Sequence, residues 1–235
     1  MIDKSTTSST NIYTKVAGIT YILIIILALI PSSIFDIGSM LKAKDAAKNL
    51  VGHEGIFRIG IAIEFMMFLL VMVLSWALYV ILKPVNKNLA LLGLIFRFGE
   101  AILGCVIIVF YLMVLMFLGG AEYLQVFEAE QLQALARFSL ILSGVGYHIL
   151  LTVMGIGGLV FCYLFYISTY IPRPLAAWGI ITYLTMIIYG FINIALQNPQ
   201  SELAYAMAPG ALFEVIIGFW LLFKGVNVNQ QKQPQ

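Results

Sequence analysis

Long apolar segments separated by short polar ones make up most of this chain, and the pattern predicts helices that cross a lipid bilayer. A helix needs about 20 mostly apolar residues to span the hydrocarbon layer, and six segments reach or pass that length. Proline-bearing turns at 82–88 and 170–174 each end a helix. The predicted spans are Val16–Phe35, Ile56–Leu82, Leu89–Leu118, Phe138–Tyr170, Leu175–Leu196 and Leu203–Phe223.

The expected fold is all-α, a polytopic bundle of six transmembrane helices in one domain over residues 16–225. A polar segment, 1–15, precedes this domain, and a glutamine-rich tail, 226–235, follows it and is predicted to be disordered. The core of a secretory signal usually has about 7 to 15 residues, and the first apolar segment is longer and lacks a small-x-small cleavage site. We therefore interpret this segment as a retained helix.

Basic residues gather on one side of the predicted membrane, and this asymmetry sets the orientation. Six spans put both termini on one side, where seven Lys and Arg residues accompany one acidic residue, whereas the other side carries five basic and seven acidic residues. Both termini are therefore predicted to be cytoplasmic, because positive residues favour that side of a plasma membrane. An amphipathic helix is expected on the membrane surface at 37–50, either as a connector or for lipid recognition.

Composition narrows the classes of function. Hydrophobic residues make up 62% of the 235 residues and charged residues 10%, which excludes an ordinary soluble domain and leaves the lipid bilayer as the main partner. The net charge of +2 gives no reason to expect a nucleic-acid partner. Cys105 and Cys162 lie inside apolar segments and are predicted to be free thiols.

Apart from Arg58 near the end of a span, six charged, imidazole or amide side chains fall inside the predicted spans, where hydrocarbon disfavours them. An ionised group at mid-bilayer costs about 2.5 to 3.5 kcal/mol on insertion scales, so each must face protein, water or a ligand. Helical spacing places most of them on stripes with glycine or other small residues, which favour close helix packing. We expect them to line one polar pocket as candidate ligand-binding residues: Glu64, Arg97, Glu100, His148, Asn193 and Glu214.

Three carboxylates against one guanidinium would leave this pocket with an excess of about two negative charges if all were ionised. A protonated glutamate, a cationic His148 or an external cation can each remove that excess. We therefore assign the glutamates as proton or cation acceptors, Arg97 as their counter-ion and His148 as a titrating group. The alternative is a polar network that only fixes helix packing.

Motifs that carry catalysis are absent from the sequence. The chain has no H-E-x-x-H, C-x-x-C, G-x-S-x-G or glycine-rich phosphate loop, so no catalytic residue and no cofactor are assigned. No metal site is predicted, although one histidine with several glutamates would suit a divalent cation. The hydroxyls of Ser75, Ser143 and Thr152 are expected to bond to backbone carbonyls rather than act as nucleophiles.

Several segments in order along the chain carry a family resemblance. They are VAGITYILIII (16–26), EGIFRIGIAIE (54–64), LYVILKPVNKNLALLGLIFRFGEAIL (78–103), the His148 region, YISTYIPRPLAAWG (166–179) and APGALFEVIIGFWLLFKG (208–225). Together they resemble the bacterial integral-membrane family called domain of unknown function 4386. The resemblance implies six membrane helices, and the family has no established activity to carry over to this chain. It also implies recurrent polar positions at Arg58, Glu64, Arg97, Glu100, His148, Pro172, Arg173, Pro209, Glu214 and Lys224.

The leading hypothesis is a bacterial plasma-membrane protein that binds a small ligand or cation in its polar core, as a transporter or a sensor. A membrane-embedded enzyme and a structural or accessory subunit of a membrane complex are the alternatives. The sequence assigns neither the ligand nor the oligomeric state.

Overall fold

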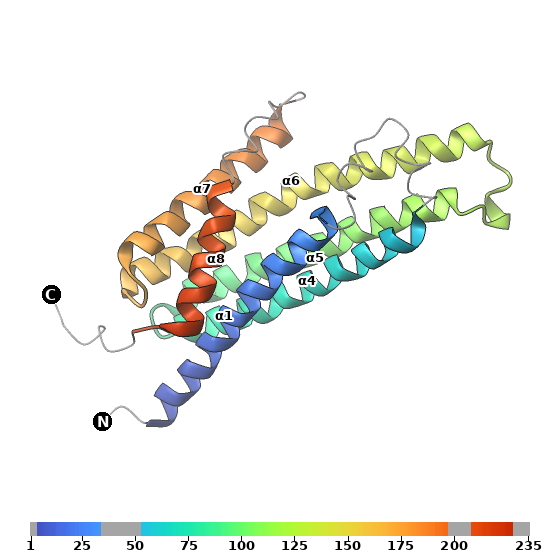
Figure 1. Ribbon diagram of the computed structural model, residues 1–235. Helices are drawn as coiled ribbons and strands as arrows, with labels where there is room; N and C mark the ends of the chain where they lie inside the picture. The colour runs from blue at the N-terminus through green and yellow to red at the C-terminus, as the bar shows by residue number, and fades with distance from the viewer. Residues whose placement is uncertain (1–3, 34–52, 197–207, 228–235) are drawn as a thin grey trace. The chain divides into compact units, whose positions relative to one another are not determined.

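The computed structural model describes residues 4–33, 53–196 and 208–227, and within these ranges the chain forms helices and no strand (Figure 1). This confirms the all-α fold class. One short 3-10 turn, η1 (Glu122–Leu124), accompanies the α-helices. The α-helices are α1 (Lys4–Ser33), α4 (Glu54–Leu82), α5 (Lys87–Leu118), α6 (Ala129–Ser168), α7 (Arg173–Ala195) and α8 (Ala208–Phe223).

Five of these helices, α1, α4, α5, α6 and α7, are long and apolar enough to cross a membrane. The sixth, α8, has 16 residues, and the start of its predicted span at 203–207 lies outside the described residues. The amphipathic helix predicted at 37–50 and the tail from 228 onward lie outside them as well. The described chain is therefore compatible with a multi-pass membrane protein without fixing the number of crossings at six.

Two helices extend well beyond their predicted apolar spans. The first predicted span starts at Val16, whereas α1 begins at Lys4, within the segment expected to precede the membrane domain. The sequence predicts a span from Phe138, whereas α6 begins at Ala129 and contains 40 residues. At 1.5 Å per residue this is about 60 Å, roughly twice the thickness of the hydrocarbon layer. Its first turns, AEQLQALAR, are rich in good helix formers, so helical hydrogen bonding continues past the point where the apolar pattern ends.

Both proline-bearing turns separate helices, as the sequence predicted. At the first turn, α4 ends at Leu82. At the start of α5, the backbone N–H of Leu89 donates a hydrogen bond to Oδ1 of Asn86 at 3.0 Å. This side-chain bond satisfies one of the donors that a helix start leaves free. At the second turn, α6 ends at Ser168 and Pro172 is the N-cap of α7.

The chain divides into two compact units. Of the described residues, unit 1 contains 4–25, 69–101, 148–196 and 208–227, and unit 2 contains 26–33, 53–68 and 102–147. Helices α1, α4, α5 and α6 each contribute residues to both units. The six candidate polar residues are therefore divided between the two units.

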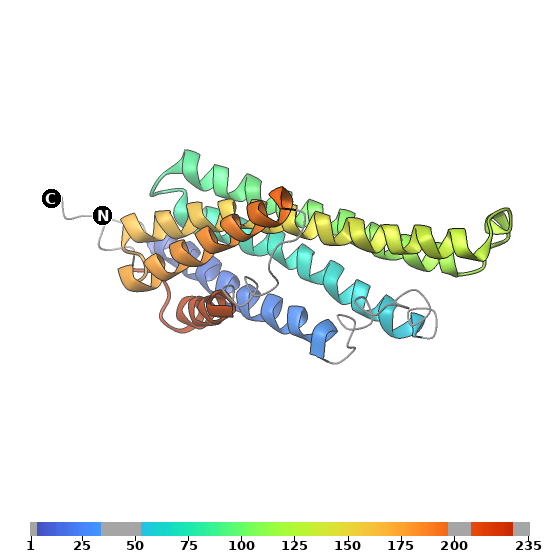
Figure 2. The same cartoon turned by 90° about the horizontal axis from the view of Figure 1, so that it is seen from above.

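Apolar side chains from several helices form the core of unit 1, including the buried Leu74, Phe165 and Phe213. Within this unit α6 and α7 run side by side, as Figures 1 and 2 both show. Glycine makes the approach close, because a Cβ at Gly190 would lie 2.8 Å from the carbonyl oxygen of His148. Small residues in membrane helices permit such backbone contacts.

Unit 2 is packed mainly by aromatic and aliphatic side chains. The ring of Phe68 lies directly against Gly104, and Tyr111 meets Phe57 edge-on with ring centroids 6.0 Å apart. Both phenylalanines are buried. Tyr111 is the polar member of this group, and its hydroxyl shares a hydrogen bond with Ser143.

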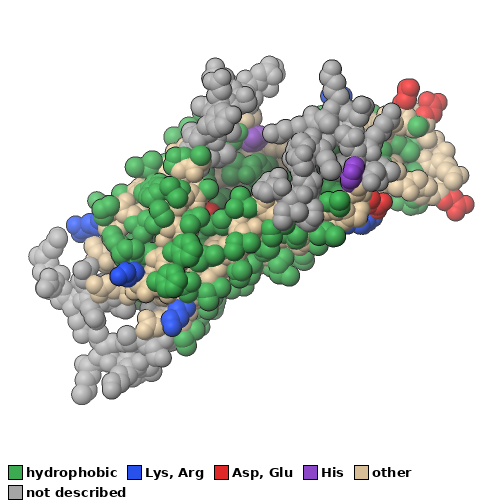
Figure 3. Space-filling model, in the orientation of Figure 1, with side chains coloured by type: hydrophobic (Ala, Val, Ile, Leu, Met, Phe, Trp, Pro, Cys, Tyr) green, Lys and Arg blue, Asp and Glu red, His purple; other side chains and the backbone are tan. Residues whose placement is uncertain are grey.

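The outer surface carries many large apolar side chains (Figure 3). Phe138, Ile181 and Phe191 are each more than half exposed, at 56%, 64% and 57%. Patches of this extent are unusual on proteins surrounded by water. Lipid is a suitable solvent for them, which agrees with the length and composition of the helices.

Candidate functional site

A buried ion pair on α5 is the first part of the site. Arg97 and Glu100 lie three residues apart, so the helical repeat puts them on one face. Nη1 of Arg97 is 2.7 Å from Oε2 of Glu100, and each side chain is only 4% exposed. Because both charges are removed from solvent, deletion of Arg97 would leave Glu100 buried without its counter-charge.

The second part joins α7 to α8. The hydroxyl of Tyr183 donates a hydrogen bond to Oε1 of Glu214 at 3.1 Å. Tyr183 is buried, Glu214 is partly buried, and the two residues are 31 positions apart in sequence. Tyr21 of α1 shares a further hydrogen bond with Tyr183. These bonds fix the position of a carboxyl group that lies among apolar side chains.

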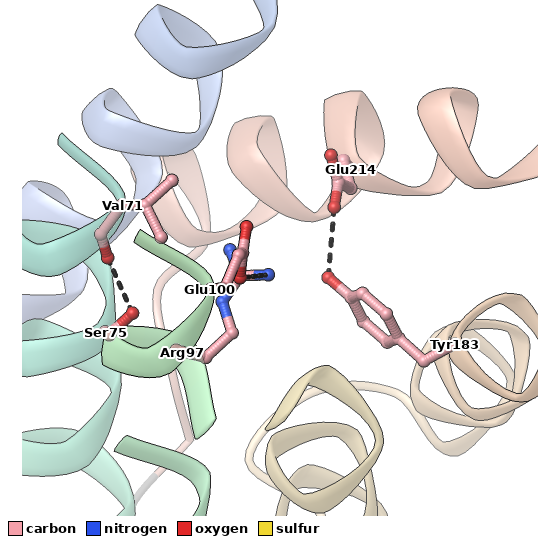
Figure 4. A network of polar contacts seen from close by, with 6 residues as sticks. All are labelled: Val71, Ser75, Arg97, Glu100, Tyr183 and Glu214. Atoms are coloured by element: carbon pink, nitrogen blue, oxygen red, sulfur yellow. Dashed lines mark hydrogen bonds and ion pairs between the residues drawn. The ribbon is translucent and has the colours of Figure 1, made fainter. Parts of the chain in front are cut away.

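The two parts belong to one group of side chains, which we call the polar cluster. Figure 4 shows the polar groups of Arg97, Glu100, Tyr183 and Glu214 facing one another. The charge of Arg97 acts on Glu100, Glu214 and both tyrosines, and the buried thiol of Cys162 is also within electrostatic reach. The polar cluster thus consists of Tyr21, Arg97, Glu100, Cys162, Tyr183 and Glu214, drawn from five helices of unit 1.

Two consecutive glycines of α6 make room for the polar cluster. A Cβ at Gly157 would lie 2.9 Å from Cγ of Arg97, and one at Gly158 would overlap the ring of Tyr183. The Tyr183 ring also meets Phe213 edge-on, with centroids 6.0 Å apart. The side chains of Arg97 and Tyr183 are therefore held by packing as well as by polar contacts.

The polar cluster includes residues that the sequence analysis did not select. Tyr21 and Tyr183 were not singled out, and Cys162 was treated only as an apolar residue. Helical spacing in the sequence predicts an inward stripe on the fifth helix, and of its residues the structure buries only Thr182: Trp178, Thr182, Thr185, Tyr189 and Asn193. A pattern of small residues flanking Tyr183 gives the correct face: Ala176, Gly179, Tyr183, Met186 and Gly190 are buried. The helix turns this face inward because small residues allow α7 to approach its neighbours.

His148 and Asn193 lie apart from the polar cluster within unit 1. The Tyr183 ring contacts Gly158, and His148 precedes Gly158 by ten residues on α6, or about 15 Å along the helix axis. His148 contacts the ring of Tyr189 instead, with centroids 5.8 Å apart. Asn193 donates its side-chain N–H to the carbonyl of Tyr189 at 2.8 Å. His148 and Asn193 therefore lie at a different level of α6 and α7 from the polar cluster.

Glu64 belongs to unit 2. It is partly buried on α4, and its charge acts on Tyr111 of α5, whose hydroxyl bonds with Ser143. Of the six candidate residues, the structure thus brings together Arg97, Glu100 and Glu214.

The hydroxyls of Ser75, Ser143 and Thr152 bond to backbone carbonyls of their own helices. Ser75 donates to the carbonyl of Val71 at 2.6 Å (Figure 4), Ser143 to that of Leu140 at 2.7 Å and Thr152 to that of His148 at 3.0 Å. This confirms the expected use of the three hydroxyls. Cys105 and Cys162 are free thiols, also as predicted.

The donor set of the polar cluster suits a small ion better than a coordinated transition metal. In the ranges that the structure describes, no three His, Cys, Asp or Glu side chains lie close enough to hold a metal ion. Two carboxyl groups, two phenols and one guanidinium instead offer hydrogen-bond donors and acceptors. Their chemistry is that of binding or releasing a proton or a weakly coordinated cation.

A family comparison covers nearly the whole chain. The family model described as Domain of unknown function (DUF4386) matches residues 16–225, which confirms the resemblance seen in the sequence. No curated protein and no solved structure matches the chain.

Proposed function

Because the chain belongs to the family described as Domain of unknown function (DUF4386), we propose a function from the polar cluster rather than from a characterised relative. The protein binds one proton or one small cation at the polar cluster, as a transporter or a sensor in a bacterial plasma membrane. Six membrane crossings and cytoplasmic termini form part of this proposal, on the charge asymmetry and the apolar segments of the sequence.

One observation carries the proposal: two carboxyl groups on different helices, those of Glu100 and Glu214, lie near one guanidinium, that of Arg97, which pairs with Glu100 at 2.7 Å and acts on Glu214 at longer range. With all three groups ionised, the polar cluster has one uncompensated negative charge. A net charge in a low-dielectric interior is costly, so one bound positive charge is favoured. A proton on a carboxyl group or a monovalent cation beside it restores neutrality.

Glu214 is the group that exchanges the positive charge. Glu100 is occupied by Arg97 at 2.7 Å, whereas Glu214 receives one neutral hydrogen bond from Tyr183 at 3.1 Å. A carboxylate has room for several hydrogen bonds or cation contacts, so Glu214 retains free acceptor capacity.

Thermal unfolding of the purified protein in detergent tests the proposal. Unfolding temperatures are compared in lithium, sodium, potassium and choline chloride at constant ionic strength, at pH 6 and pH 8. The wild type is expected to show a shift with at least one small cation or with pH, and Glu214→Gln to lose it. Glu122→Gln, an exposed glutamate of η1, is the matched control and should retain the shift.

Absence of any shift in the wild type, or an equal shift in Glu214→Gln, contradicts binding at the polar cluster. Proteoliposomes that contain a pH-sensitive dye then separate the two roles. A transporter moves protons or exchanges them for the cation across the vesicle membrane, whereas a sensor binds the ion without moving it.

A further inference from the structure

A second polar site lies at the ends of the helices of unit 1, away from the membrane-embedded residues of the polar cluster. The turn between α6 and α7 and the segment after α8 enclose a pocket of about 750 Å³. Arg173, Trp220 and Lys224 line it, with the backbone of Tyr170 and Asn227. The volume is in the range of small-molecule sites and accommodates a phosphate group with a glycerol attached.

The two cations of this pocket come from different segments and have no acidic partner in the part of the chain that the structure describes. Arg173 is the first residue of α7, and Lys224 directly follows α8. Both side chains are exposed, and the guanidinium of Arg173 lies 6.0 Å from the ring centroid of Tyr166. Two positive charges on the lining of one pocket, with no acidic side chain among the lining residues, attract a negatively charged ligand.

The backbone holds the pocket open in a defined shape. The N–H of Asn227 donates to the carbonyl of Tyr170 at 3.0 Å, which ties the segment after α8 to the α6–α7 turn. Gly225 has φ of +71°, a left-handed conformation that glycine adopts easily and that turns the chain back after α8. Burial raises the pKa of the Tyr170 phenol, so this residue adds no charge to the pocket.

The position of the pocket indicates the kind of anion. It lies where the apolar segments of α6 and α7 end, which is the level of lipid headgroups if these helices cross a membrane. Trp220 is partly buried beside it, and tryptophan favours that interface. The positive N-terminal end of the 23-residue α7 adds to the attraction for phosphate.

We infer that this pocket binds a phosphate group, with Arg173 and Lys224 as its two cationic contacts. The phosphate can belong to an anionic lipid or to a soluble phosphate ester. In the orientation proposed above, the pocket faces the cytoplasmic leaflet, where anionic lipids attract basic residues. The inference is independent of ion binding at Glu214.

Native mass spectrometry of the detergent-solubilised protein tests the inference. The protein is titrated with phosphatidylglycerol, with phosphatidylcholine and, in a separate arm, with inorganic phosphate and glycerol phosphate. Wild type is expected to retain one phosphatidylglycerol in preference to phosphatidylcholine. Arg173→Gln with Lys224→Gln should weaken that binding about tenfold or more.

Lys83→Gln with Lys87→Gln is the matched control, because it removes two exposed positive charges from the α4–α5 turn, outside the pocket. It should leave the selective binding unchanged. If only the soluble phosphates bind, and the Arg173/Lys224 variant loses them, the phosphate site stands and its ligand is a soluble ester.

Equal loss in both double variants, or no preference for phosphate-bearing anions in the wild type, overturns the inference. Unfolding temperatures without lipid show whether the Arg173/Lys224 variant is folded. If it is not, Lys224→Gln alone gives the answer, because this exposed side chain follows the last turn of α8.

Discussion

Tyr183 of α7 donates its hydroxyl hydrogen to Glu214 of α8 at 3.1 Å while its ring rests on Gly158 of α6. A single side chain therefore joins three helices and fixes the carboxyl group that we assign to ion exchange. The hydroxyl orients the carboxyl group, and the ring holds the hydroxyl in place. These two contributions can be separated by substitution.

Removal of the hydroxyl alone should destabilise the protein modestly. Tyr183→Phe keeps the ring packing on Gly158 and Phe213 but leaves the carboxyl of Glu214 without its donor. An unsatisfied buried acceptor costs about 1 to 3 kcal/mol, so the unfolding temperature should fall by several degrees. Tyr163→Phe, on the exposed side of α6, is the control and should change little. Equal stability of Tyr183→Phe and wild type would argue against this hydrogen bond.

The ion pair of α5 should behave as a unit. Arg97→Met leaves Glu100 buried without its counter-charge and should cost about 3 to 5 kcal/mol. Combining it with Glu100→Leu removes both charges and should recover a large part of that loss. Unfolding temperatures of the two single variants and the double variant form a double-mutant cycle. Additive losses would mean that the two side chains do not depend on each other.

The hydropathy of the sequence was sufficient to predict the helices, because burial in lipid demands long apolar runs. Helices α4, α5 and α7 begin within two residues of their predicted spans. Where a helix continues past its apolar segment, as at the starts of α1 and α6, the apolar pattern stops before the helical hydrogen bonding does. Hydropathy alone therefore does not predict where a helix begins when it continues beyond its apolar segment.

The polar cluster was predictable in part. Hydrocarbon disfavours charge, so a charged residue within an apolar segment is easily recognised in the sequence. This signal identified Arg97, Glu100 and Glu214. Tyr183 was missed because tyrosine is tolerated at many positions of membrane helices, and only the neighbouring small residues show which way it points. His148 was expected in the same pocket, but the contact of Gly158 with Tyr183 places the polar cluster about 15 Å along α6 from His148.

Gly158 should not tolerate an added methyl group. A Cβ at this position would overlap the Tyr183 ring, so Gly158→Ala forces the ring and its hydroxyl away from Glu214. Overpacking of this kind costs about 1 to 3 kcal/mol. Gly144→Ala, in the same helix, meets nothing within 4 Å and is the matched control, expected to be neutral. A comparison of their unfolding temperatures measures the effect, and similar values for both would show that α7 has space to move.

Competition between protons and cations provides the sharpest prediction for the polar cluster. One uncompensated negative charge among Arg97, Glu100 and Glu214 needs one positive charge, so a proton and a small cation exclude each other there. The cation-dependent rise in unfolding temperature should therefore be larger at pH 8 than at pH 6, because fewer protons compete. Tyr183→Phe should still show this pH dependence with a weaker response, since Glu214 remains but is no longer oriented. A cation response that is the same at both pH values would mean that the cation and the proton bind at different places, and Glu214 would then lose its assigned role.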